Sequence, residues 1–287
     1  MASPFIADWK RGEKERLVWI DFERYAARVF AGSPVDWYRN PVRFAATIGQ
    51  AHRVIPSELV SIDLTAPFLD FLQQAAGESG QKDSPAAQSA VLRLAQLLEE
   101  TAPFEFVSQV VDALAHSIGD DAVLVLKLQS PRELLFAAGA TDEVAGDFGA
   151  LDEVGTALGK LIRRLSSKPL ACLQLCCDSG LTADEEDACD PLFRAAEYYG
   201  WASALSFAHC GDDFPPLPKV DLALFRDLPA ERLLGATDRR FGGGLPALFW
   251  LDGGSLPAKP GVLYGVIPEE SSPETVAERM QMLSALR

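Results

Sequence analysis

The sequence predicts an α/β fold, and within that class a (β/α)8 barrel of the TIM type. Eight apolar runs of strand length recur along the chain, and helix-length amphipathic segments separate the first four of them. The length of 287 residues suits such a barrel, which usually has roughly 250 residues. We therefore predict a single domain over residues 1–287, with an N-terminal helical segment at 1–57 and the barrel at 58–287.

The N-terminal segment shows apolar residues at helical spacing. Trp19, Phe22, Ala26 and Val29 fall on one stripe of a helix, which Gly32 and Pro34 would stop. Asn40 followed by Pro41 is typical of a second helix, with an N-cap and a proline at its first position. These patterns predict a helical extension ahead of the barrel.

The first half of the barrel follows a regular strand–helix rhythm. Apolar runs at 59–64, 122–128, 170–177 and 201–208 predict strands, because each has strand length and ends at a turn signal. Helices are predicted between them. Thr182 and Glu185, for example, form a capping-box pattern that begins the helix after the third run.

The second half is shorter between its strands. The apolar runs lie at 220–225, 233–236, 247–251 and 262–267, and the gaps between them leave little room for helices. A parallel crossover needs about a dozen residues or more, so this half has either degenerate helices or some antiparallel pairing. The glycines at 242–244 and 253–254 lack the spacing of a phosphate-binding loop and are predicted to form turns.

The net charge, the N-terminal residues and the cysteines limit the kinds of function that the protein can have. A formal charge of −15 argues against a broad basic face for nucleic acid or anionic membranes. The N-terminus has no basic segment followed by an apolar core, and the five cysteines are an odd number with two adjacent. We expect reduced thiols, a cytoplasmic location, a small-molecule substrate, and either a protein partner or a homo-oligomer.

Acidic residues follow several of the predicted strands. The carboxyl ends of parallel strands meet at one rim, where neighbouring carboxylates can shift each other's pKa for acid–base chemistry. We predict catalytic roles for Asp63, Asp178 and Asp212, and note Asp213 and Asp252 in similar positions. The alternative is that such an aspartate only caps the next helix or turn.

Polar residues in and after the second predicted strand indicate substrate binding. Lys127 interrupts a strongly apolar run, and inside a barrel it would need a carboxylate partner to keep its charge. It could equally extend outward, with its tip in water. We predict a substrate-binding set of Lys127, Gln129, Arg132 and Asp252.

One segment offers metal ligands. His209 and Cys210 directly follow the fourth predicted strand, and Cys177 ends the third. A catalytic zinc ion takes three such ligands and keeps one position open, so we predict a zinc site at His209, Cys210 and Cys177, with the neighbouring Cys176 as the alternative third ligand. The alternative is that the cysteines are small buried residues and the histidine makes an ordinary hydrogen bond.

Three regions together resemble the superfamily of uroporphyrinogen decarboxylase and cobalamin-independent methionine synthase. They are residues 19–64, residues 198–212 and residues 261–268 with the helix that follows. The resemblance implies a (β/α)8 barrel, and in the metal-binding members a zinc ion that activates a thiol to accept a methyl group. Cys210 and Gly211 match the metal strand of that family, and Asp63 matches the central aspartate of its decarboxylase branch.

The sequence also departs from that family. Ala208 stands where the metal-binding members have histidine, no cysteine follows Cys210, and the decarboxylase branch's arginine-rich substrate loop is absent. The resemblance implies methyl transfer to or from a small molecule, assisted by zinc. Two alternatives stay open: a metal-free decarboxylase or lyase that uses the strand-end carboxylates, and a non-catalytic binding or assembly subunit.

Overall fold

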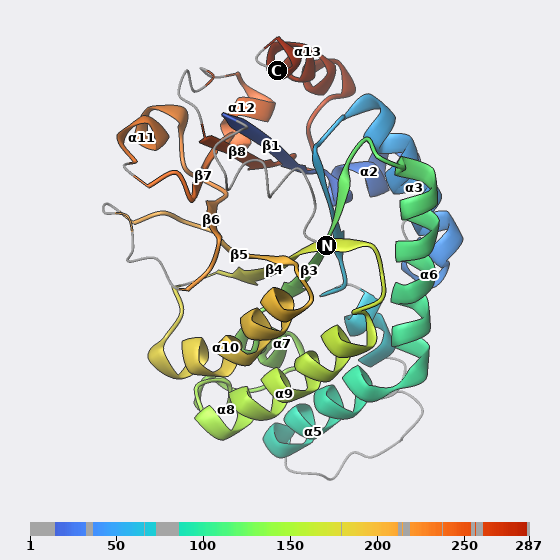
Figure 1. Cartoon of the computed structure of the whole chain (residues 1–287), viewed down its shortest axis with the longest axis vertical. Helices are drawn as coiled ribbons and strands as arrows, with labels where there is room; N and C mark the ends of the chain where they lie inside the picture. Colours follow the sequence, from blue (N-terminus) through green and yellow to red (C-terminus); the bar gives the residue numbers. More distant parts are fainter. Residues whose placement is uncertain are drawn as a thin grey trace.

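The computed structural model describes residues 15–32, 37–65, 67–72, 86–178, 180–211, 214, 219–236, 238–253, 256 and 261–285. Within them, parallel strands close into a barrel in chain order from β1 to β8 (Figure 1). The predicted (β/α)8 barrel is confirmed. Because every pair of neighbours is parallel, the alternative of a partly antiparallel second half is wrong. No described helix is both long enough and apolar enough to cross a membrane.

The strands are short and mostly buried. They are β1 (Arg16–Asp21), β2 (Leu59–Asp63), β3 (Val123–Gln129), β4 (Leu170–Cys177), β5 (Ala202–Phe207), β6 (Leu222–Phe225), β7 (Phe241–Gly244) and β8 (Gly261–Val266).

The longest described helices belong to the first half of the barrel, and the described helices of its second half are shorter than these. The first-half helices are α2 (Glu23–Phe30), α3 (Pro41–Val54), α5 (Ala86–Glu99), α6 (Thr101–Ile118), α7 (Pro131–Ala137), α8 (Asp142–Ala145), α9 (Phe148–Arg164) and α10 (Ala183–Tyr198), with a 3-10 turn at Trp37–Arg39. The second-half helices are α11 (Ala230–Gly235), α12 (Ala247–Leu251) and α13 (Pro273–Ser284). The predicted shortening of the second half is therefore present (Figure 1).

The boundary between an N-terminal helical segment and the barrel requires correction. Residues 16–21 form β1, the first barrel strand, so the segment 1–57 is not wholly helical and the barrel does not begin at 58. The helical spacing is real only from Phe22 onward, where α2 buries Tyr25 and Ala26. Trp19 extends that spacing by coincidence, since its ring lies inside the barrel.

Two predicted strands and one predicted turn also differ. The runs at 233–236 and 247–251 lie in or next to α11 and α12, because short apolar runs cannot be told from buried helical turns by periodicity. The glycines at 242–244 belong to β7 instead of a turn. A Cβ atom on Gly242 would lie 2.6 Å from Leu224 Cδ2, so the large neighbours fill the barrel at this strand and leave room only for glycine.

The β1–β2 seam is the weakest junction of the barrel ladder. Only Trp19 and Leu59 are in register there, whereas β1 and β8 pair over the whole length of β1. Side chains replace the missing ladder bonds. Glu58 Oε2 accepts from Val18 N at 2.7 Å, and Ser57 Oγ accepts from Ile20 N at 2.9 Å. Backbone N–H groups that would otherwise be buried without partners are thereby satisfied.

Candidate active site

A polar cavity of about 390 Å³ lies at the carboxyl ends of the strands. Alternate residues of a strand point to the same side, so the last inward-facing positions of the strands meet there. The described residues that line it are Asp21, Glu23, Arg24, Asp63, Thr65, Leu69, Lys127, Gln129, Cys176, Asp178, Ser206, Arg226, Tyr264 and Val266. This end of a (β/α)8 barrel is where enzymes of the fold carry their active sites.

An ammonium group between two carboxylates forms the centre of the cavity. Lys127 Nζ lies 2.6 Å from Asp21 Oδ2 and 2.9 Å from Asp63 Oδ2. Burial alone would lower the pKa of Lys127, but the two carboxylates outweigh it and raise that pKa well above its usual value. Burial likewise opposes the charge of Asp63, yet Lys127 and the Thr65 hydrogen bonds lower its pKa. Lys127 and Asp63 are therefore charged at neutral pH.

The pKa of Glu23 is shifted in the direction opposite to that of Asp63. Its side chain is buried, and its Oε2 accepts a hydrogen bond of 2.9 Å from Asp63 N. Burial first, and then the negative charges of Asp63 and Asp21, raise the pKa of Glu23 well above its ordinary value, although Lys127 opposes the shift. The pKa values of two neighbouring carboxyl groups in the cavity, Glu23 and Asp63, are thus shifted in opposite directions.

A chain of buried hydrogen bonds sets the direction of the Tyr264 hydroxyl. Trp19 Nε1 donates to Ser61 Oγ at 3.0 Å, and Ser61 Oγ donates to Gln174 Oε1 at 3.3 Å. The Gln174 amide in turn donates to Tyr264 Oη at 3.3 Å. Because Oη already accepts from Gln174, its own O–H is left to donate into the cavity. Burial raises the pKa of Tyr264, so the hydroxyl remains protonated.

Two arginines supply positive charge near the mouth. Arg226 Nη2 lies 2.5 Å from Asp178 Oδ1. Arg24 lines the cavity, is exposed, and makes no ion pair with any other residue that the structure describes. The Arg24 guanidinium is therefore available to an anionic group that enters the cavity.

The structure brings together only part of the predicted catalytic and substrate-binding sets. Asp63, Asp178, Lys127 and Gln129 line the cavity. Arg132 is not among the lining residues; its guanidinium lies over the Phe136 ring at 5.5 Å. Asp252 follows α12 instead of a strand, because the run before it is helical. Asp212 and Asp213 lie outside the described residues.

The predicted zinc ligands do not meet. His209 is exposed and its Nδ1 lies 2.7 Å from Asp227 Oδ2, whereas Cys210 Sγ lies 3.7 Å from Arg232 Nη2. Cys177 faces away from the cavity into the outer core, because it alternates with the inward-facing Cys176. Across the described residues, no group of three or more His, Cys, Asp or Glu side chains is arranged to hold a metal ion. The described residues therefore give no support to a zinc site at His209, Cys210 and Cys177.

Several cavity residues were missed at the level of sequence. They are Asp21, Glu23, Arg24, Ser206, Arg226 and Tyr264. Asp21 and Glu23 follow an apolar run at 17–20, which is the same signal that drew attention to Asp63, but that run was assigned to a helix. Arg226 directly follows a run that was correctly predicted as a strand.

Cys176 provides a direct test of the inward-facing positions. Its thiol lines the cavity and accepts a hydrogen bond from Ser206 Oγ at 3.1 Å, and burial raises its pKa to about 11. We expect a small thiol reagent to modify Cys176 before Cys177, and faster as the pH approaches that pKa. Mass spectrometry should show that the Cys177→Ser variant still takes up the label. The Cys176→Ser variant should no longer take it up. Equal labelling of both variants would contradict the orientation.

Comparisons with known proteins add little to this description. No protein-family model and no curated protein matches the chain. Among solved structures, the chain is similar to an apo endo-β-N-acetylglucosaminidase from Cordyceps militaris, with 12% identity, 98% of this chain and 94% of that chain covered, and a TM-score of 0.44. The fold and the cavity by themselves define an enzyme-like (β/α)8 barrel with a polar, charged site at its catalytic end.

Proposed function

We propose that this barrel is a lyase that decarboxylates a small carboxylic acid with its own side chains. One observation carries the proposal: Glu23, a buried carboxyl group that accepts a hydrogen bond from Asp63 N, lies beside the Asp21–Lys127–Asp63 cluster at the carboxyl ends of the strands. The cavity volume lies at the lower end of the usual range for small-molecule sites, roughly 300–1,000 Å³. The decarboxylase branch of the superfamily that the sequence resembles is in keeping with this chemistry.

The chemistry follows from the charges. The bond between the substrate's carboxylate and its neighbouring carbon breaks, carbon dioxide leaves, and the electron pair stays on that carbon. The Lys127 ammonium and the Tyr264 O–H stabilise the developing negative charge, since fixed donors act strongly in a buried site. Glu23 then delivers its proton to the carbon and is reprotonated from water. Atoms and charge balance without any further reactant.

The charged groups also account for substrate capture. Arg24 and Arg226 lie near the mouth, and a guanidinium matches a carboxylate through two parallel hydrogen bonds. A substrate with a second carboxylate would be held by these arginines, with its reacting carboxylate toward Lys127. Methyl transfer through zinc receives no comparable support, because the proposed ligands lie apart and one of them lies beside a guanidinium.

Carboxylate binding tests the proposal before the substrate is known. We expect succinate and oxaloacetate to raise the melting temperature and to bind in calorimetry, and oxaloacetate or a related β-keto acid to release carbon dioxide. Arg24→Gln should weaken binding about tenfold or more, as loss of a charge-assisted hydrogen bond implies. Arg53→Gln, which removes an exposed arginine in the last turn of α3 that does not line the cavity, is the matched control. Failure of every carboxylate to bind, or turnover that does not depend on Glu23, would contradict the proposal.

A further inference from the structure

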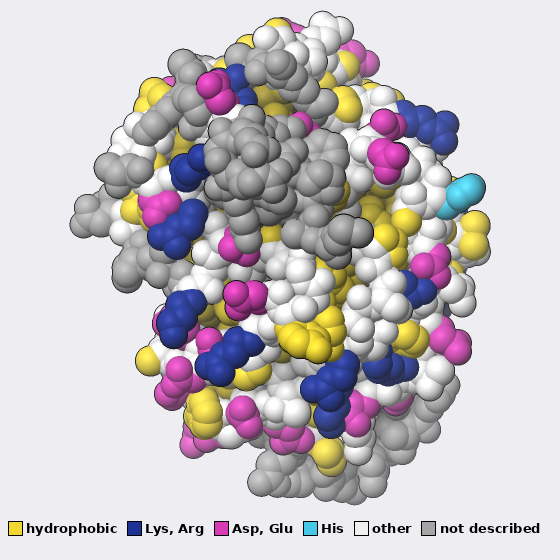
Figure 2. All heavy atoms as spheres, viewed as in Figure 1, with side chains coloured by type: hydrophobic (Ala, Val, Ile, Leu, Met, Phe, Trp, Pro, Cys, Tyr) yellow, Lys and Arg dark blue, Asp and Glu magenta, His cyan; other side chains and the backbone are white. Residues whose placement is uncertain are grey.

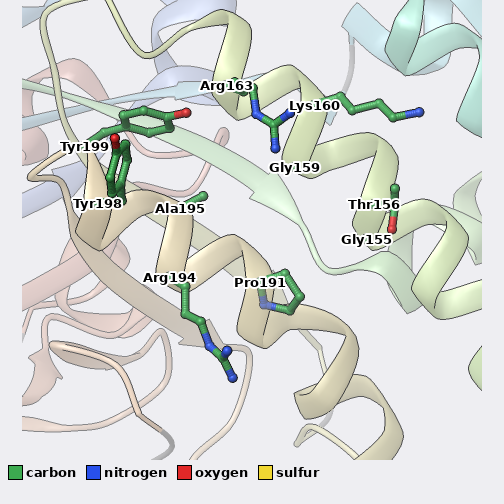
Figure 3. A pocket seen from close by; sticks show the side chains of 10 residues that line it. All are labelled: Gly155, Thr156, Gly159, Lys160, Arg163, Pro191, Arg194, Ala195, Tyr198 and Tyr199. Atoms are coloured by element: carbon green, nitrogen blue, oxygen red, sulfur yellow. The ribbon is translucent and has the colours of Figure 1, made fainter.

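A second cavity, of about 550 Å³, lies on the outer surface between α9 and α10. Its floor consists of small residues, among them Gly159, Pro191 and Ala195, and its walls carry arginine, lysine and tyrosine side chains (Figure 3). The described lining contains no acidic residue, although the whole chain has a net charge of −15. Figure 2 shows basic and hydrophobic side chains side by side on the part of the surface where these helices lie in Figure 1.

The three cations of this groove differ in what they face. Lys160 extends away from the groove toward Glu99, with which it forms an ion pair, and Arg194 is paired with Asp190 of its own helix. Arg163 instead extends from α9 into the space between the helices (Figure 3). Its side chain is exposed, and its guanidinium has no ion pair or hydrogen bond with any other residue in the described part of the chain.

Two aromatic rings complete the groove. Tyr198 and Tyr199 contact each other edge to face, with ring centroids 5.2 Å apart. Tyr198 has 84% of its surface exposed, and the Tyr199 hydroxyl points toward Arg163 in Figure 3. Exposed aromatic faces are stacking surfaces for planar rings, and an unengaged guanidinium is suited to a carboxylate or a phosphate.

We propose that this groove binds a small ligand made of a planar ring and an anionic group, either phosphate or carboxylate. The ring stacks on the tyrosines and the anionic group pairs with Arg163. The groove lies at the carboxyl ends of α9 and α10, where the helix dipoles repel anions, so binding of the anionic group depends on this guanidinium. Since both helices run back toward the amino ends of the strands, the site is separate from the strand-end cavity and independent of the proposed reaction.

Calorimetry with simple probes tests this proposal. AMP or phthalate is expected to bind, and adenosine or inorganic phosphate alone to bind at least about tenfold more weakly, because each offers only one of the two recognised groups. Arg163→Gln should weaken binding of AMP or phthalate by about tenfold or more. Arg53→Gln removes an exposed arginine from the last turn of another helix and should leave binding unchanged.

A second variant tests the groove by filling it with a side chain and leaves its charges unchanged. A Cβ atom on Gly159 would make only an ordinary contact of 3.7 Å with Leu192, so the first side-chain atom has room, and we expect the rest of the side chain in Gly159→Leu to extend into the groove. The same change favours the helix, because glycine is a poor helix former. We expect a folded protein that no longer binds the probes. Probe binding that survives both Arg163→Gln and Gly159→Leu, or no binding of AMP and phthalate at millimolar concentration, would overturn the proposal.

Discussion

Replacing Lys127 with methionine is expected to lower the free energy of unfolding by about 3–5 kcal/mol, because it leaves two carboxylates in the cavity without their counter-ion. Asp21 and Asp63 both lie within 3 Å of the ammonium in the native protein, so its removal takes the paired positive charge from both. Denaturant unfolding at neutral pH measures the change. Decarboxylation should also fall by at least about a thousandfold, since the stabilising charge is removed from the reacting carbon.

The pH dependence of this loss follows from the pKa shifts. The raised pKa of Lys127 contributes stability below its unfolded value near 10.4, and this contribution is lost as pH rises through the folded pKa. The lowered pKa of Asp63 contributes stability above its unfolded value near 3.9, and this contribution is lost as the carboxylate protonates in acid. The gap between wild type and Lys127→Met should therefore be widest between about pH 4 and pH 10.

Two controls separate the charge effect from simple loss of packing. Lys160→Met breaks an exposed ion pair and should cost at most about 1 kcal/mol. Adding Asp21→Asn and Asp63→Asn to Lys127→Met removes the stranded charges and should restore most of the stability without restoring turnover. A Lys127→Met protein as stable as wild type at neutral pH would show that the cluster is not a buried ion network.

Replacing Glu23 with glutamine is expected to separate stability from activity. The carboxyl holds its proton in the folded protein, so above its unfolded pKa near 4.3 the fold must take up a proton that the unfolded chain releases. This uptake reduces wild-type stability as pH rises from about 4 to the folded pKa. Glutamine is neutral and can still accept the hydrogen bond from Asp63 N. The variant should be at least as stable as wild type at pH 7, with a flatter pH profile.

Activity should respond in the opposite direction. Without the proton of Glu23, turnover is expected to fall by about a hundredfold to ten-thousandfold, the range for loss of a general acid. Glu185→Gln is the matched control, because Glu185 is also buried, burial also raises its pKa, and it accepts a hydrogen bond from Ser130 in the outer layer. That variant should change the pH profile of stability in the same sense and leave turnover unaltered. Glu23→Gln with wild-type turnover would refute the assignment.

The sequence could predict a strand only where the strand has an apolar run of its own. Strand runs flanked by turns and separated by amphipathic helices predicted six of the strands, and Asp63 and Asp178 followed directly from their ends. The strand β7 has glycines where its neighbours Leu224 and Val262 fill the barrel, so it has no apolar signal of its own. Only the three-dimensional neighbours explain why those glycines form a strand.

The predicted zinc ligands form no common site among the described residues, for a related reason. Sequence adjacency places Cys177, His209 and Cys210 near two strand ends, but the side on which each side chain emerges depends on strand register. Cys176 and not Cys177 faces the cavity, and His209 lies beyond the last residue of β5. Likewise, the pairing of Lys127 with Asp21 required knowing that β1 begins at residue 16, which the helical spacing of the first apolar residues obscured.

The β1–β2 seam is the place where the barrel wall depends on side-chain hydrogen bonds more than on backbone pairing. A ladder bond breaks only when two strands move apart, whereas a side chain leaves its partner by rotating about a single bond. Ser57, Glu58 and, at the top, Glu23 hold the seam in this second way. Glu23 is thus both a hydrogen-bond partner that holds β2 beside β1 and the proton donor proposed for the cavity. Rotation of its side chain would break the hydrogen bond across the seam and move the proposed general acid out of the cavity at the same time.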